Sequence, residues 1–176
     1  MNVMTRMDEV ILVDEKDAPL GRMEKMEAHR RALLHRAFSV FVFNSSGEML
    51  LQRRAGEKYH SAGLWTNACC SHPRPGEDTD KAAGRRLHEE LGFATPLEKA
   101  FEFTYRSEFD NGLTEYEFDH VFTGIYDGEV FPDSSEVSEY SWLRPEDIRA
   151  RLTQEPQEFT SWFRLAFPMI CEKMGI

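Results

Sequence analysis

The first third of the chain is organised as short apolar runs separated by polar turn residues, a pattern typical of β-strands. Residues 9–14 form the first run, which ends at the turn-forming residues 17–21. A polar segment with basic residues follows. Two further runs, 38–43 and 49–54, flank residues 44–47, which have the length and composition of a hairpin loop. The pattern therefore predicts three strands here, two of them paired as a hairpin.

Helical spacing replaces the strand-like runs after Gly76. The acidic segment 77–80 suits a helix N-terminus, and apolar residues then recur at helical spacing until Gly92, which predicts a helix over residues 79–91. The remaining predicted elements are aromatic-rich antiparallel strands at 101–109 and 115–126, a short strand at 140–143, a short helix at 145–152 and a final helix at 159–174, interrupted near Pro168.

This mixture of strands and helices contains no internal repeat and no low-complexity linker. We therefore expect one α+β domain over residues 1–176, with a mixed, antiparallel-rich central sheet flanked by helices. We expect the N-terminal extension, about residues 1–30, to be mobile.

Composition narrows the classes of function. The formal net charge of -10 over 176 residues argues against a protein whose main task is to bind nucleic-acid phosphates. Three cysteines make a poor disulfide framework, and a reactive thiol survives best in a reducing compartment, so we expect a cytoplasmic protein. The N-terminus lacks a signal-peptide pattern and the longest apolar run is too short to span a bilayer, so no membrane partner is expected. A monomer is the expected state, although the sequence does not decide between a monomer and an oligomer.

Two pairs of reactive side chains share a spacing of two residues. Cys70 and His72 form one pair, and Glu115 and Glu117 form the other. On an extended backbone, side chains two residues apart point to the same side. We therefore expect a thiol, an imidazole and two carboxylates to face one pocket.

The predicted helix carries part of a known signature. Residues 77–93 resemble the tail of the Nudix pattern Gly-x5-Glu-x7-Arg-Glu-aliphatic-x-Glu-Glu-x-Gly-aliphatic. The positions in register are Glu77, Arg85, Leu87, Glu89, Glu90, Gly92 and Phe93. Two positions depart from the pattern, because Ser71 replaces the opening glycine and Arg86 replaces the glutamate after the signature arginine. The loss of that acidic residue argues against hydrolysis of a diphosphate bond.

Three further motifs narrow the resemblance. They are His-Arg-Ala-Phe-Ser at 35–39, Trp-Thr-Asn-Ala-Cys-Cys-Ser-His-Pro at 65–73 and Glu-Tyr-Glu at 115–117. In this order and within a Nudix-like frame, they resemble the type 1 isopentenyl diphosphate isomerases over about residues 9–162. The resemblance implies a Nudix-like α/β/α fold and the interconversion of isopentenyl and dimethylallyl diphosphate, small molecules used in isoprenoid biosynthesis.

Moving an unactivated double bond requires a proton donor and a proton acceptor. The resemblance assigns these roles to Cys70 and Glu117, which lie on different predicted strands. It also implies that Tyr105 polarises or relays the proton at Glu117, and that the ring of Trp162 covers a developing carbocation. Core packing is the alternative explanation for both aromatic side chains.

The resemblance also implies two metal sites. The ligands of a hexacoordinate Mn²⁺ or Zn²⁺ site would be His29, His35, His72, Glu115 and Glu117. A Mg²⁺ ion bridging the diphosphate would be held by Glu90, and the basic side chains that bind the phosphates would be Lys25, Arg54, Lys58 and Arg86. Ligand type alone does not choose between manganese and zinc. No metal role is assigned to His60, His88 or His120.

Two other classes of function compete with the isomerase. A Nudix hydrolase would cleave a diphosphate substrate, and Arg86 argues against it. A Nudix-like binding module without catalysis would not require Cys70, His72, Glu115 and Glu117 together. The sequence therefore predicts an isomerase, with the hydrolase as the alternative.

Overall fold

Strand β3 (His35–Phe43) lies in the middle of the sheet and pairs with strands on both sides. It runs parallel to β8 (Thr114–Ile125) and antiparallel to β6 (Cys69–Ser71). Strand β8 in turn pairs antiparallel with β7 (Glu98–Glu108). The structure is a computed structural model that describes residues 8–176.

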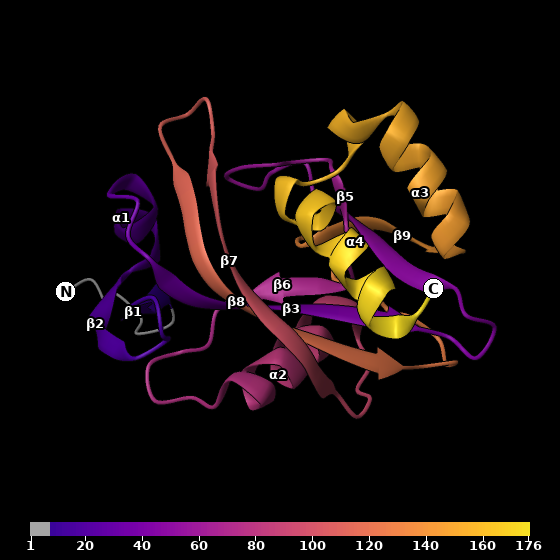
Figure 1. Cartoon of the computed structure of the whole chain (residues 1–176), viewed down its shortest axis with the longest axis horizontal. Coiled ribbons are helices and arrows are strands. Elements are labelled where there is room, and N and C mark those ends of the chain that lie inside the picture. Colours follow the sequence, from indigo (N-terminus) through magenta and orange to yellow (C-terminus); the bar gives the residue numbers. More distant parts are fainter. Residues whose placement is uncertain (1–7) are drawn as a thin grey trace.

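The other described elements extend this sheet and cover it (Figure 1). The remaining strands are β1 (Glu9–Val13), β2 (Pro19–Glu24), β4 (Met49–Arg54), β5 (Trp65–Thr66) and β9 (Val137–Leu143). The helices are α1 (Lys25–Arg30), α2 (Thr79–Leu91), α3 (Pro145–Gln154), the 3₁₀-helix η2 (Pro156–Glu158) and α4 (Ser161–Met174). Over residues 8–176, no helix has the length and apolarity needed to cross a bilayer.

Alternate side chains of β3 pack into two separate cores, because strand side chains point to opposite faces in turn. Phe38, Val40 and Val42 pack with the buried face of α2. Phe41 and Phe43 pack on the other face with α3 and α4. Figure 1 shows α2 and α4 on opposite sides of the sheet. The predicted α+β fold, a mixed sheet flanked by helices, is therefore confirmed.

Most predicted elements are present with ends that differ by a few residues. The helix over 79–91 and the strand over 49–54 have the predicted bounds. The final helix differs, because α4 continues through Pro168 and the predicted interruption is wrong. Pro168 is exposed, while the opposite face of α4 is buried in the core, and that burial holds the helix together across the missing backbone donor.

The polar segment after β1 contains two elements that the sequence pattern did not indicate. Strand β2 pairs with β1, and the six-residue helix α1 follows it directly. The carboxylate of Glu24 caps α1 by accepting hydrogen bonds from the backbone N–H groups of Met26 and Glu27, both at 2.8 Å. Such a helix is too short to show amphipathic periodicity. Of the extension expected to be mobile, residues 1–7 lie outside the described part of the chain, and residues 9–30 contain β1, β2 and α1 with the turn between the two strands.

Candidate active site

The two adjacent cysteines point to opposite faces of the sheet. Cys69 is fully buried in the core beneath α2. Cys70 faces the α4 side, where β6 places it opposite Ser39 of β3. Cys70 is the partly accessible member of the pair. Strand β6 therefore places the Cys69 thiol in the core and the Cys70 thiol in the site.

Three polar side chains contact the Cys70 sulfur, and a fourth lies behind one of them. Its S–H donates to Oδ1 of Asn67 at 3.1 Å, and the indole Nε1–H of Trp162 donates to the sulfur at 3.1 Å. The hydroxyl of Ser39 lies 3.4 Å from the sulfur and donates to the buried carboxylate of Asp119 at 2.7 Å. Burial, followed by the negative charge of Asp119, raises the pKa of the Cys70 thiol. The thiol therefore holds its proton at neutral pH.

Glu117 lies between two strands that each direct a reactive side chain at it. The β3–β8 register places it beside His35, and the β7–β8 register places it opposite Tyr105. The Tyr105 hydroxyl contacts both carboxylates, at 2.6 Å from Glu117 and 2.9 Å from Glu115. The predicted clustering of these residues therefore follows from strand pairing, including one parallel pair.

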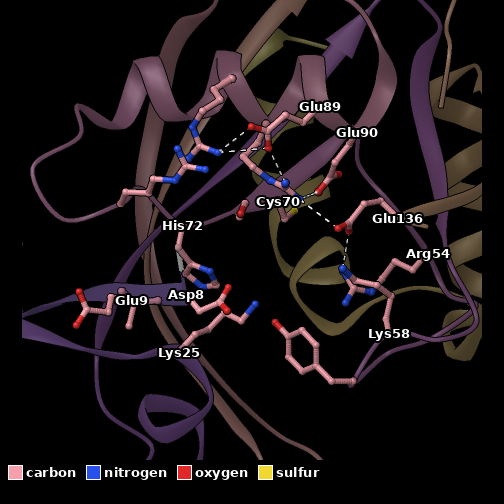
Figure 2. A pocket seen from close by; sticks show the side chains of 16 residues that line it. Asp8, Glu9, Lys25, Arg54, Lys58, Cys70, His72, Glu89, Glu90 and Glu136 are labelled. Carbon is pink, nitrogen blue, oxygen red and sulfur yellow. Dashed lines mark hydrogen bonds and ion pairs between the residues drawn. The ribbon is translucent and has the colours of Figure 1, made fainter. Parts of the chain in front are cut away.

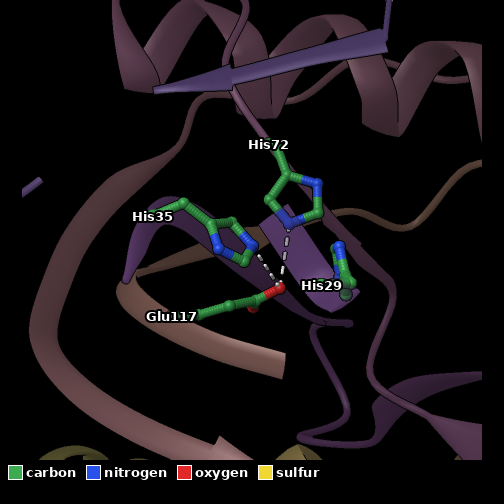
Figure 3. Close-up of side chains that lie close together, drawn as sticks. All are labelled: His29, His35, His72 and Glu117. Carbon is green, nitrogen blue, oxygen red and sulfur yellow. Dashed lines mark hydrogen bonds and ion pairs between the residues drawn. The ribbon is translucent and has the colours of Figure 1, made fainter. Parts of the chain in front are cut away.

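Glu117 is ionised in this environment. Its Oε1 lies 2.8 Å from Nε2 of His72 and 3.5 Å from Nε2 of His35 (Figure 3). Burial alone would raise the pKa of Glu117, but the two imidazoles outweigh burial and bring it well below its usual range. The site thus pairs a protonated thiol with an ionised carboxylate.

The imidazoles around Glu117 are oriented as metal ligands. Nδ1–H of His29 donates to the backbone carbonyl of Lys25 at 2.6 Å, and Nδ1–H of His35 donates to that of Leu33 at 2.8 Å. These hydrogen bonds leave the Nε2 lone pairs free, and both Nε2 atoms are buried without a well-aligned hydrogen-bond partner among the described residues. Buried nitrogens of this kind fit a divalent transition metal.

The geometry of the cluster supports this fit. One ligand atom from each of His29, His35, His72 and Glu117 lies within 4.8 Å of the others. Burial, followed by the nearby His72, lowers the pKa of His29 to about 4, so its imidazole is neutral at physiological pH. Neutral imidazole is the form that binds metals. Glu115, the fifth predicted ligand, lies instead in a second group with His29 and His60, whose ligand atoms are also within 4.8 Å of one another.

Two cavities meet at Cys70 and His72. The smaller, of about 30 Å³, is also lined by Tyr105, Glu115, Glu117 and Trp162. The larger, of about 380 Å³, carries the cationic side chains Lys25, Arg54, Lys58, Arg74, Arg85 and Arg86 (Figure 2). A small niche with proton-transfer groups therefore adjoins a larger cavity lined by charged side chains, six of them cationic.

Acidic side chains form ion pairs with the basic side chains of the larger cavity. Arg86 donates to Glu89 and to Glu90, both at 2.7 Å, and Lys58 pairs with Glu136. Glu90 is buried, and burial raises its pKa despite the adjacent Arg86 guanidinium. A divalent cation on Glu90 would therefore need to compete with Arg86 or share the carboxylate with it.

Arg54 connects the two cavities. It lines both of them, and its guanidinium lies over the Trp162 ring, 5.2 Å from the ring centroid. Lys25 lies similarly close to the ring of Tyr59, at 5.0 Å. The sequence did not indicate these aromatic supports, which orient cationic side chains toward the larger cavity.

Every predicted site residue lies in one of the two cavities or in the metal-ligand cluster. The unassigned His88 is exposed on α2, and His120 contacts Asp17 at 2.9 Å. The side chains that were missed are Ser39, Asn67, Asp119, Tyr59, His60 and Glu136. Asp119 follows Glu117 by two residues on β8, and this spacing was the one signal available for it.

Comparison with known proteins places the chain in a family. The NUDIX domain matches residues 33–163. An isopentenyl-diphosphate Delta-isomerase of Pectobacterium atrosepticum is 51% identical over 162 residues, which cover 92% of this chain and 90% of the relative. A protein of the same name from Burkholderia multivorans is 50% identical over 156 residues, which cover 89% of each chain.

Solved structures share the fold at lower sequence identity. DR0079 from Deinococcus radiodurans has a TM-score of 0.78 at 21% identity, covering 92% of this chain and 98% of that one. A MutT protein from Methanosarcina mazei Go1 has a TM-score of 0.67 at 23% identity, covering 81% and 96%. The chain therefore belongs to the NUDIX superfamily and, within it, to the type 1 isopentenyl-diphosphate Delta-isomerases.

Proposed function

We propose that this chain interconverts isopentenyl diphosphate and dimethylallyl diphosphate. The observation that carries the proposal is the position of Cys70 and Glu117 on the walls of one narrow cavity, which adjoins a larger cationic cavity. Relatives about half identical over most of their length carry the name of this activity. The substrate is thus a small molecule with an allylic unit and a diphosphate.

The protonation states of the two groups suit this reaction. The terminal carbon of the double bond gains one proton and the neighbouring methylene loses one, so protons balance overall. Burial favours a protonated Cys70, and the imidazoles of His72 and His35 favour an ionised Glu117. The resting site thus offers one donor and one acceptor. The Tyr105 hydroxyl, 2.6 Å from Glu117, supplies a relay for the proton at that carboxylate.

Trp162 contributes to the same niche. Its buried indole borders the small cavity beside Cys70. A tertiary carbocation develops between protonation and deprotonation, and an aromatic ring stabilises such a cation while water would capture it. Trp162 is therefore assigned to the substrate site rather than to core packing alone.

Lys25, Arg54, Lys58 and Arg86 bind the diphosphate in the larger cavity in this proposal. The diphosphate brings roughly three negative charges at neutral pH, and charge-assisted hydrogen bonds are the strong ones available to it. Glu90 would hold Mg²⁺ at the same place, where the ion neutralises phosphate oxygens. The support is that all five side chains line one cavity.

A transition metal, Mn²⁺ or Zn²⁺, is assigned to His29, His35, His72, Glu115 and Glu117. Such an ion would fix the orientation of Glu117 and lower its basicity. His29 and His35 contribute imidazoles whose Nδ1–H groups are anchored to backbone carbonyls. Glu117 then serves both the metal and the proton transfer.

We also expect the enzyme to act as a monomer. Cys69, Cys70 and Cys171 are free thiols, and a reducing compartment such as the cytoplasm preserves them.

A phosphate-release assay separates this function from Nudix hydrolysis. Purified protein is supplied with Mg²⁺ and with Mn²⁺ or Zn²⁺ and incubated with isopentenyl diphosphate or with nucleoside diphosphates. We expect dimethylallyl diphosphate from the first and no inorganic phosphate from either, because Arg86 occupies the position of the acidic residue in the hydrolase signature. Phosphate release without isomer would support the hydrolase.

A further inference from the structure

His60 lies in the loop between β4 and β5 and is buried against the metal-ligand cluster. Its Nε2 lies 2.8 Å from Oε1 of Glu115. We propose that His60 is an additional ligand of the transition-metal centre, a fourth imidazole beside those of His29, His35 and His72. This inference rests on the metal centre of the proposed function and adds a residue that the family resemblance does not assign.

The nitrogen of His60 that faces Glu115 is not satisfied by it. Although the two atoms are 2.8 Å apart, Nε2 of His60 is buried and has no well-aligned hydrogen-bond partner within residues 8–176. Nε2 of His29 and of His35 are in the same condition. Nearly all buried polar atoms in proteins have a hydrogen-bond partner. Three buried imidazole nitrogens without one, in the same cluster, therefore indicate that they share a ligand such as a metal ion.

The His60 ring is held in place on several sides. It stacks on Phe109, with ring centroids 4.6 Å apart and planes within 7°, and meets Tyr59 edge-on at 4.4 Å. Its Nδ1 lies 3.2 Å from the Ser61 hydroxyl, and Arg54 donates to its backbone carbonyl at 3.2 Å. A fixed ring with its free nitrogen turned to a carboxylate is preorganised for ligation.

His29 joins His60 to the main cluster. Ligand atoms of His29, His60 and Glu115 lie within 4.8 Å of one another, as do those of His29, His35, His72 and Glu117. Nδ1 of His29 is already bound to the Lys25 carbonyl, so His29 has one nitrogen left and serves one ion. The two groups have only His29 in common, so a single ion held by four imidazoles and two carboxylates would draw His60 and Glu115 toward the other ligands. Six ligands of this type suit a transition metal.

The alternative is that His60 only positions Glu115 by a hydrogen bond. That role would alter metal affinity without changing the number of coordinated imidazoles. A direct count of the imidazoles bound to the metal therefore distinguishes ligation by His60 from positioning of Glu115.

His60→Phe is the first test variant because phenylalanine keeps the stacking on Phe109, and His88→Phe on the exposed surface of α2 is the matched control. His60→Asn is the second variant, in case the larger apolar ring prevents folding. Far-ultraviolet circular dichroism of the metal-free proteins checks the fold. Chelator competition then measures the Kd for Zn²⁺, and X-ray absorption of the zinc-loaded proteins counts coordinated imidazoles.

We expect four imidazoles in the wild-type protein and three in the folded His60 variant, with Kd weakened by at least about tenfold and His88→Phe unchanged. Equal imidazole counts in wild type and variant would overturn the inference, whatever the change in Kd. A wild-type protein that binds no zinc would overturn the metal centre and this inference together. Isomerase activity, assayed separately, tells that result apart from a failure of the proposed function.

Discussion

The indole N–H of Trp162 donates a hydrogen bond to the sulfur of Cys70 across 3.1 Å. This contact joins α4 to β6, so the C-terminal helix fixes the position of the proposed catalytic thiol. The family resemblance implies a role only for the face of the Trp162 ring. The structure adds the ring edge, which donates to whatever charge develops on the sulfur.

Replacing Trp162 with phenylalanine keeps an aromatic ring but removes this N–H donor. A hydrogen bond of this kind contributes roughly 0.5–1.5 kcal/mol, so we expect kcat to fall about two- to tenfold with little change in KM. Trp142→Phe is the control, because Trp142 packs against the α2 core on the other face. Steady-state kinetics with isopentenyl diphosphate make the comparison. Equal kcat values for wild type and Trp162→Phe would contradict a catalytic contribution from the indole N–H.

The adjacent cysteines offer a matched pair for the catalytic thiol. Cys70→Ala removes the proposed proton-transfer group and should reduce kcat by about 10²–10⁴-fold, the usual range for a general acid or base. Cys69→Ala changes a buried core thiol and should lower thermal stability while retaining most of kcat. Initial rates and melting curves of both variants test this split. Comparable kcat losses in the two variants would contradict it.

Glu117→Gln is expected to give a loss of isomerisation of similar size, about 10²–10⁴-fold, because an amide cannot accept the proton. The variant should still bind isopentenyl diphosphate, since the cationic cavity is intact. Isothermal titration with the substrate measures binding while turnover is blocked. Normal turnover by this variant would exclude Glu117 from the proton transfer.

The neighbouring arginines Arg53 and Arg54 test the diphosphate site. Arg54 lines both cavities, whereas the Arg53 side chain is exposed and pairs with Glu139. Removing a charged hydrogen-bond donor costs roughly 1.5–3 kcal/mol, so Arg54→Ala should raise KM by about ten- to a hundredfold. Arg53→Ala should leave KM nearly unchanged. Equal KM values for the two variants would place the diphosphate elsewhere.

Lower pH should destabilise the metal-free protein through His29. Its folded-state pKa is about 4, below the unfolded value of 6.5, so between these values the unfolded state binds more protons. Stability from this group is present above the unfolded value and is lost as pH falls through the folded value. Between about pH 7 and pH 5 the loss is on the order of 2 kcal/mol. Urea unfolding of the metal-free wild type and of His29→Asn, both kept with a chelator, measures this loss in the free energy of unfolding. Identical losses in the two proteins would show that His29 is not its origin.

Local patterns were sufficient to predict the elements whose side chains repeat regularly. The bounds of α2 and β4 follow from periodicity and turn residues. Helix α1 escaped prediction because six residues show no periodicity, and its stability comes from the Glu24 cap and the burial of Ala28 and His29. The error at Pro168 has the same origin, since tertiary burial of α4 outweighs a local breaker.

The site was predicted in its residues but not in its geometry. Cys70, His72, Glu115 and Glu117 were grouped by spacing, and strand alternation does place them around one cavity. The contact of His35 with Glu117 depends on the parallel pairing of β3 with β8, which involves segments far apart in the chain. His60 lies in a loop, where no periodicity indicates the direction of a side chain. Such contacts follow from tertiary structure alone.

Proton NMR in D₂O is the direct test of proton transfer by Cys70 and Glu117. Metal-supplemented protein is mixed with isopentenyl diphosphate, with Glu117→Gln and Cys70→Ala as parallel samples. We expect wild type to form dimethylallyl diphosphate carrying deuterium from solvent, while both variants leave the spectrum unchanged. An unchanged spectrum with folded, metal-loaded wild type, or normal deuterium incorporation by either variant, would contradict proton transfer between Cys70 and Glu117.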